Sequence, residues 1–354
     1  MRAGWLPLSL ALLSACAEAR IVYERDAEVE DSGVADVGVD ATSSDAGDPC
    51  RAPQDLTGMP DGCELVRPPP RPLCAGDGDV PPFEVGFLEP DFTATNGYDL
   101  DGFCTAVMGS TSCTNAAGTV PDTTPNGTDN SFAFIVVEGL EIVDPLILAS
   151  FAAANRERGV AVPMLRIEDW NGLDNDDTVV VTFAVSTGAT ETPDWTATPE
   201  LNPADGFFSA GGMPLTRDLG AYVSDGQLVA TVPDALPFDF VAEGRRLRVA
   251  LRDARIVANV DTDARTLRDF GIVGRWAVAE ALDALDLLAP CPAEAPLRTA
   301  AMNLLRRAAD VRADRAEDDS MLECNAISLA LRFREAHPIT WGEPGTVDLT
   351  PSCM

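Results

Sequence analysis

Residues 160–186 read VAVPMLRIEDWNGLDNDDTVVVTFAVS, two apolar runs on either side of a loop of Asn, Asp and Gly. The second run alternates along its length, and its apolar face comprises Val179, Val181, Phe183 and Val185. A period of two is typical of a strand that buries one face. We therefore expect strands at 160–168 and 178–186, paired antiparallel across the loop.

A helix is expected immediately before this pair, over residues 144–159. Asp144 suits the N-cap, Pro145 the first turn and Gly159 the C-terminal end. Its apolar side is Leu146, Leu148, Phe151 and Ala152. Residues 131–140 are apolar without a clear period, and we expect them to be helical as well.

The second half of the chain mixes strands and helices. In residues 247–257 the apolar positions shift by one place, which predicts a bulge near Asp253. The remaining elements expected here are strands at 227–232, 272–276 and 326–334, and helices at 278–289 and 297–312. We expect an α+β fold: a β-rich body of antiparallel sheets, sandwich-like, with several packed helices and stabilised by disulfides.

Composition divides the chain into segments. Residues 16–49 are acidic and poor in large apolar side chains, so they are expected to form a disordered tether, or else an acidic binding tail. Residues 50–90 are rich in Cys and Pro and are expected to be irregular. The β-rich body is assigned to residues 91–354, with helices and a final strand toward its end.

Nine cysteines are present, and setting aside Cys16 leaves an even number. Four disulfides are expected. A zinc site would need closer pairs than Cys104 and Cys113, which are nine positions apart. We expect Cys104 to pair with Cys113, and Cys291 with Cys324. The eight expected disulfide cysteines are Cys50, Cys63, Cys74, Cys104, Cys113, Cys291, Cys324 and Cys353.

Charge excludes several classes of function. The formal net charge is -32, which excludes nucleic acid as a partner because phosphates need a cationic surface. All 25 basic residues are arginine, so chemistry that depends on a lysine Schiff base or a lysine phosphate cradle is excluded. The single histidine, His337, has no nucleophile motif around it.

Three loops rich in Asp and Asn are candidate calcium sites, because calcium takes about six to eight oxygen ligands. The candidate ligands are Asp99, Asp101, Asp129, Asn130, Asp174, Asp176 and Asp177. EF-hand spacing is not met: the position that needs glycine holds Cys104 in one loop and Val179 in another. The alternative is that the loops are turns whose side chains bond their own backbone.

The start of the chain carries a motif of its own, Leu13-Ser14-Ala15-Cys16, after a short apolar run. It resembles the lipobox of bacterial lipoproteins. The resemblance implies a signal peptide at 1–15 and an acylated Cys16 bearing diacylglycerol and palmitate. Ala17 after the cysteine implies sorting to the outer membrane. An ordinary secretory signal, or a chance match, is the alternative.

The body loosely resembles uncharacterised secreted lipoproteins, on residues 126–130, 144–159 and 171–177. That resemblance implies no activity.

Three functions remain open. The first is a non-catalytic binding or adhesion module on the cell envelope, calcium-dependent, whose ligand is a carbohydrate, an envelope component or a protein. Trp170, beside one Asp/Asn loop, is its candidate ligand-binding residue. The second is a glycoside hydrolase using two carboxylates. The third is a structural component of the envelope.

Replacing Cys16 with Ser should release the protein from membranes, because no cysteine thiol then remains at the lipobox to carry lipid. Fractionation of expressing cells with metabolic acyl labelling measures this. Acylated, membrane-bound Cys16→Ser protein of mature size would contradict the lipobox interpretation.

Overall fold

The computed structural model describes residues 67–74, 76–92, 97–102, 113–114, 128–232, 236–242, 245–288, 291–318 and 322–346. The expected tether, together with Cys16, Cys50, Cys63, Cys104 and Cys353, lies outside these residues. Within them, no helix is long and apolar enough to cross a bilayer.

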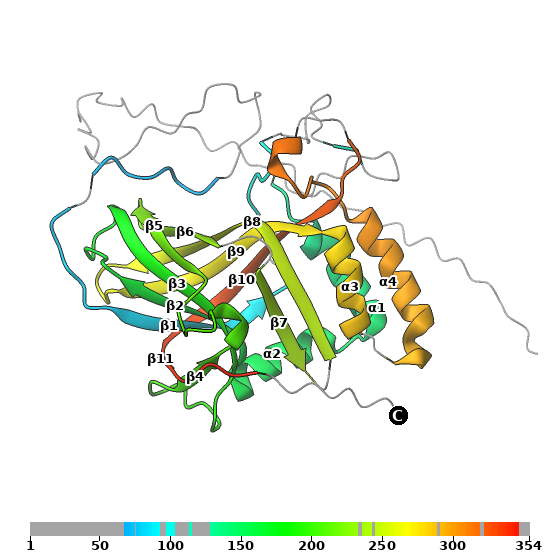
Figure 1. The fold of residues 1–354 in the computed structure, drawn as a ribbon, viewed down its shortest axis with the longest axis horizontal. Helices are drawn as coiled ribbons and strands as arrows, with labels where there is room; N and C mark the ends of the chain where they lie inside the picture. Colours follow the sequence, from blue (N-terminus) through cyan, green and yellow to red (C-terminus); the bar gives the residue numbers. More distant parts are fainter. Residues whose placement is uncertain are drawn as a thin grey trace, which may run out of the picture. The chain divides into compact units, whose positions relative to one another are not determined.

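Eight antiparallel strands close into a barrel (Figure 1). In spatial order they are β1 (Phe83–Asp91), β10 (Ala326–Pro338), β9 (Thr266–Ala277), β8 (Arg245–Asp261), β6 (Gln227–Val232), β5 (Arg217–Ser224), β3 (Asp176–Gly188) and β2 (Val160–Glu168). Closure comes from β3, which pairs with β2 on one side and β5 on the other. The sandwich expectation was therefore wrong, because one sheet bonds to itself where two packed sheets were expected.

Three further strands extend the sheet. β7 (Leu236–Ala242) pairs with the first part of β8. β4 (Glu200–Pro203) pairs with β3, and β11 (Thr340–Trp341) runs parallel to β4. A small apolar cluster on the barrel's outside lies under these strands and includes Leu88, Met164, Leu201 and Ile339.

Helices pack around the barrel wall. α1 (Val137–Val143), α3 (Val278–Leu288) and α4 (Ala295–Arg307) lie together beside β8, while α2 (Ile147–Arg158) packs against β1, β2 and β7 (Figure 1). The short turns are the π-helical η1 (Phe132–Val136) and the 3-10 turns η2 (Asp205–Phe207), η3 (Pro292–Glu294) and η4 (Arg315–Glu317).

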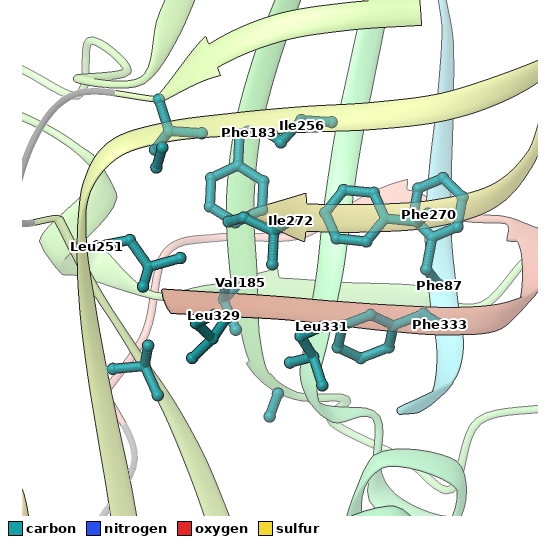
Figure 2. Packing of buried hydrophobic residues seen from close by; sticks show 14 of the residues in the cluster. Phe87, Phe183, Val185, Leu251, Ile256, Phe270, Ile272, Leu329, Leu331 and Phe333 are labelled. Atoms are coloured by element: carbon teal, nitrogen blue, oxygen red, sulfur yellow. The ribbon is translucent and has the colours of Figure 1, made fainter. Parts of the chain in front are cut away.

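Side chains that alternate along the strands fill the barrel. Figure 2 shows aromatic and aliphatic groups from β1, β3, β8, β9 and β10 meeting in the interior. Phe270 lies centrally, with ring centroids 4.8 Å from Phe87, 5.6 Å from Phe333 and 6.4 Å from Phe183. An eight-stranded barrel is just wide enough for its own side chains, so this interior is a packed core.

The predicted elements mostly form, with different ends. The strand pair of 160–186 is confirmed in β2 and β3. The register shift in β8 falls between Arg252 and Arg255, and Asp253 has φ 47°, which confirms the predicted bulge. The helix expected from Asp144 begins at Ile147, because Asp144 ends α1 and its Oδ1 accepts from the N–H of Leu146.

Two other expectations were wrong. The boundary at residue 90 cuts through β1, a strand bonded on both sides, so the body begins before it. The helix expected over 297–312 ends at Arg307. Arg312, beyond that end, is buried, and its guanidinium donates to the carboxylate of Glu317.

Cys113 is bonded to Cys324, with their Cα atoms 5.2 Å apart. This contradicts both expected pairings, Cys104 with Cys113 and Cys291 with Cys324. The two partners are 211 residues apart in sequence, a proximity that only the folded chain creates. Cys74 and Cys291 are also in disulfides.

Leu331→Ala should destabilise the protein by about 2–5 kcal/mol, because Leu331 is 1% exposed inside the barrel and its loss leaves a cavity. Denaturant unfolding measures the change. The matched control is Leu219→Ala on β5, where the leucine is 63% exposed and the expected change is within about 0.5 kcal/mol. Equal effects would contradict the packed interior.

Candidate metal centre

Three carboxylates from two segments meet on the outside of the barrel. Asp99, Asp101 and Asp129 each offer an oxygen, and these oxygens all lie within 4.8 Å of one another. The segments are joined by backbone: the N–H of Asp129 donates to the carbonyl of Tyr98 over 3.1 Å. The three side chains belong to buried residues, exposed by 7%, 8% and 4% respectively. We call them the aspartate cluster.

The wall beneath the cluster is polar because of strand alternation. On β10, Ile327, Leu329 and Leu331 face the interior, so Ser328 faces outward. Its cross-strand partner on β9 is Arg275, which faces outward beside the inward Trp276. Both outward residues are fully buried by the segments that cover them.

Arg275 attaches the first loop of the cluster to the barrel. Its Nη2 donates to the carbonyl of Leu100 over 2.5 Å. It also forms a bidentate ion pair with Asp318, at 2.7 and 2.6 Å, and donates to the carbonyl of Arg312 over 2.8 Å. Bidentate guanidinium–carboxylate pairs have a defined geometry, so the backbone between Asp99 and Asp101 has a defined position.

Further hydrogen bonds hold the carboxylates in place. Asp129 Oδ2 accepts from the N–H of Leu100 over 2.9 Å. Asp99 Oδ2 accepts from Arg67 Nε and Nη2 at 3.0 and 2.8 Å, and its Oδ1 accepts from the N–H of Gly102 over 2.6 Å. Gly102 has φ 84°, a backbone conformation that favours glycine.

A fourth carboxyl, Asp310, lies behind the cluster. It accepts from the N–H of Ser328 over 2.8 Å and from the Ser328 hydroxyl. Burial raises the pKa of Asp310 from 3.8 to about 7, and the charge of Asp101 also raises it. The pKa of Asp129 is raised well above its ordinary value, first by burial and then by Asp101, Asp310 and Asp99.

These directions of pKa shift mean that negative charge on Asp129 is poorly compensated by the protein. A small cation would offset it. Calcium–oxygen distances of about 2.3–2.6 Å place opposite ligands about 4.6–5.2 Å apart, which suits oxygens within 4.8 Å of one another. A cavity of about 90 Å³ borders Asp99 and Asp101, well below the roughly 300 Å³ at which pockets for organic ligands begin.

The remaining predicted ligands lie elsewhere. Both polar atoms of the Asn130 side chain bond the backbone of Ala330, at 3.1 and 3.2 Å, so the amide serves β10. In the loop 171–177, Asp176 accepts from the N–H groups of Asn171 and Thr178, at 2.7 and 3.1 Å. These bonds fit the alternative interpretation, in which the loop is a turn whose side chains bond its own backbone.

Asp174 and Asp177 belong to the same turn. Asp174 is exposed, and its carbonyl accepts from the N–H of Gly226 in the β5–β6 turn. The carbonyl of Asp177 accepts from Arg71 Nη1 over 2.5 Å. Of the seven candidate ligands, Asp99, Asp101 and Asp129 come together, whereas Asn130 bonds β10 and Asp174, Asp176 and Asp177 belong to a separate turn.

Trp170 is not a surface residue. It is 2% exposed, its Nε1 donates to the carbonyl of Leu173 over 3.1 Å, and its ring lies 6.1 Å from that of Phe83. The ligand-binding role expected for Trp170 was therefore wrong, because core packing already uses both its ring and its N–H.

His337 lies near the end of β10, opposite Gly86 of β1 and beyond the part of β10 that pairs with β9. Its Nε2 is 3.3 Å from Glu335 Oε2 and its ring is 5.5 Å from that of Trp195. These contacts give the imidazole a role in packing and hydrogen bonding.

The sequence reasoning missed Asp310 and Arg275. One signal for Arg275 was present: a single charge interrupts the apolar run of 272–277. Such a charge in a buried strand requires a carboxylate partner. No comparable signal marks Asp310.

Comparison with protein-family models, with curated proteins and with solved structures found no match for this chain.

Asp129→Asn should flatten the pH dependence of stability in chelator. Both Asp129 and Asp310 have folded-state pKa values above the unfolded ones, so the native state binds more protons and stability falls as pH rises from about 4. For Asp310 the fall ends at about pH 7. Melting temperatures across this range measure it.

The asparagine removes the contribution of Asp129 and keeps an oxygen for the N–H of Leu100. The matched control is Asp174→Asn, in the exposed turn, which should leave the profile unchanged. If Asp129→Asn kept the wild-type dependence of stability on pH, the charge of Asp129 would already be compensated within the folded protein, which would contradict the prediction.

Proposed function

We propose that this chain is a lipid-anchored protein of the bacterial cell envelope, attached through Cys16, whose barrel is a non-catalytic binding or adhesion module stabilised by calcium. The observation that carries the calcium proposal is the meeting of Asp99, Asp101 and Asp129, buried and within 4.8 Å. The lipobox carries the proposed anchor.

A cation at the aspartate cluster would join two segments of the covering layer. Asp99 and Asp101 come from one loop, and Asp129 comes from the segment that leads into η1. Two hydrogen bonds already join these segments: the N–H of Asp129 donates to the carbonyl of Tyr98, and the N–H of Leu100 donates to the Asp129 carboxylate. Calcium would add bonds to both segments at once and neutralise charge that the protein leaves poorly compensated. It would thereby make the outer layer rigid, which suits a surface module.

The same geometry favours binding over glycoside hydrolysis. Hydrolases place their two carboxyl groups about 5–5.5 Å apart for retention and about 6.5–9.5 Å apart for inversion. The cluster's oxygens lie within 4.8 Å, its carboxylates belong to buried residues, and the adjoining cavity measures about 90 Å³. A sugar ring between two carboxylates would need more room than this.

Calcium should raise the melting temperature of the purified protein at neutral pH, and chelator should lower it. At a free calcium concentration about one hundred times the dissociation constant, mass action adds about 2.7 kcal/mol to the free energy of unfolding. Thermal melts over a calcium titration measure this. Magnesium should substitute poorly, because it requires near-octahedral geometry and dehydrates reluctantly.

Asp101→Asn should abolish the response, because a cluster carboxylate is lost. Asp174→Asn is the matched control and should keep the response, since Asp174 lies in the separate exposed turn. Identical melting curves in chelator and in calcium for the wild-type protein would sink the calcium proposal.

A further inference from the structure

A second hollow lies beside the β7–β8 ribbon. It measures about 270 Å³ and is bounded by the end of β3, by η2, by residues 345–346 and by the outward face of β7 and β8. Phe207, Val185 and Ser186, exposed by 2%, 3% and 3%, are its most deeply buried lining residues. We call this hollow the arginine cleft.

Strand alternation places two arginines in the cleft. Leu247 and Val249 of β8 are buried in the core, so Arg246 and Arg248 face the opposite way. Asp239 of β7 pairs with Arg248 across the ladder. Arg248 and Asp239 form a bidentate ion pair at 2.9 and 3.1 Å, so the charge of Arg248 is neutralised within the wall.

Arg246 is held more loosely than Arg248. Its side chain is only 23% exposed, and it shares Asp239 with Arg248 through an ion pair in which Asp239 Oδ2 lies 3.5 Å from Arg246 Nε. The Nε is buried and makes no hydrogen bond. A guanidinium has several N–H donors in a planar fork, and leaving such donors buried without an acceptor costs free energy. An acceptor in the cleft could supply the hydrogen bond that Asp239 does not make to Arg246 Nε.

We propose that the arginine cleft binds a small organic monocarboxylate, its carboxylate against Arg246 and its apolar body against Ala204 and the small area that Val185 and Phe207 expose. The planar fork of a guanidinium matches the two oxygens of a carboxylate. The apolar lining residues would shield the rest of the ligand from water. The cleft measures about 270 Å³, just under the roughly 300 Å³ at which pockets for organic ligands begin, so it limits the ligand to about the size of one ring.

Charge selects a monoanion over a phosphate. Asp239 pairs with both Arg246 and Arg248, so these three groups together carry one net positive charge, and the exposed Asp205 also lies at the lining. The formal net charge of the chain is -32, so a dianion would meet stronger repulsion on approach.

The proposal is tested on the purified protein with benzoate as the probe, using calorimetric titration and saturation-transfer NMR. Benzoate should bind saturably. Benzamide, its neutral analogue, should bind at least about tenfold more weakly than benzoate, because the charge-assisted bonds are lost. Acetate, which lacks the apolar body, and phenyl phosphate, a dianion, should both be weaker than benzoate.

Arg246→Gln should lower benzoate affinity by about tenfold to a hundredfold, and Arg246→Lys should restore it only in part because the fork is lost. The matched control is Arg268→Gln, since Arg268 also has an acid 3.5 Å from its Nε but is 62% exposed. Arg246→Gln should melt at or above the wild-type temperature, since Arg246 lacks a firm partner. A marked fall would make Arg246 a structural residue and overturn the proposal.

Gly206→Phe tests the cleft without touching the arginine. A Cβ added at Gly206 meets no heavy atom within 4 Å, so the fold should tolerate a side chain there while the cleft becomes filled. Benzoate binding should be lost. The control is Gly211→Phe, in an exposed loop where the nearest atom is 3.9 Å away.

Failure of benzoate to saturate, equal affinity for benzamide, or unchanged binding in Arg246→Gln or Gly206→Phe would each overturn the proposal. None of these outcomes depends on calcium, because none of the cluster's aspartates lines the arginine cleft.

Discussion

The pairing of β3 with β5 is the constraint on which the rest of the structure depends, because it turns an open sheet into a barrel. Closure lets the eight strands satisfy one another's backbone hydrogen bonds. The interior of an eight-stranded barrel is just wide enough for its own side chains. Phe270 and its aromatic neighbours fill that space. With the interior full, both candidate sites lie on the outside of the wall.

The outer wall carries a second organising pair, Arg275 opposite Ser328. Each binds a carboxylate from the same covering segment, Asp318 on Arg275 and Asp310 on Ser328. Arg275 also holds the loop of Leu100. Buried ion pairs give little net stability after desolvation, so we interpret this network as a device that specifies which segments cover this part of the barrel. The aspartate cluster forms where those segments meet.

Local pattern was sufficient for much of the secondary structure. The alternation of Val179, Val181, Phe183 and Val185 marks β3, and the one-place shift in β8 marks the bulge at Asp253. Element ends were less predictable: Asp144 fits an N-cap by type, yet its backbone ends α1. Capping residues serve either neighbour, and packing of the two helices decides which one they serve.

For the candidate sites too, the local pattern indicated some residues and long-range contacts decided the rest. The pattern of Asp and Asn included Asp99, Asp101 and Asp129, which the fold brings together, but it equally favoured Asp176, whose carboxylate bonds its own turn. Composition is the same in both loops, and only long-range contacts distinguish them. Arg246 gave no signal, because its loose pairing depends on which strand lies opposite it.

Sequence alone therefore determined the strand faces, most of the helices, the excess of negative charge and the absence of lysine chemistry, since these depend on residue type and on spacing along the chain. Only the tertiary structure decided that the sheet closes, that Cys113 meets Cys324 and that Asp310 lies behind Asp101. Each of those pairings joins residues far apart in sequence. Their proximity comes from the collective packing of the whole barrel, and no local pattern encodes it.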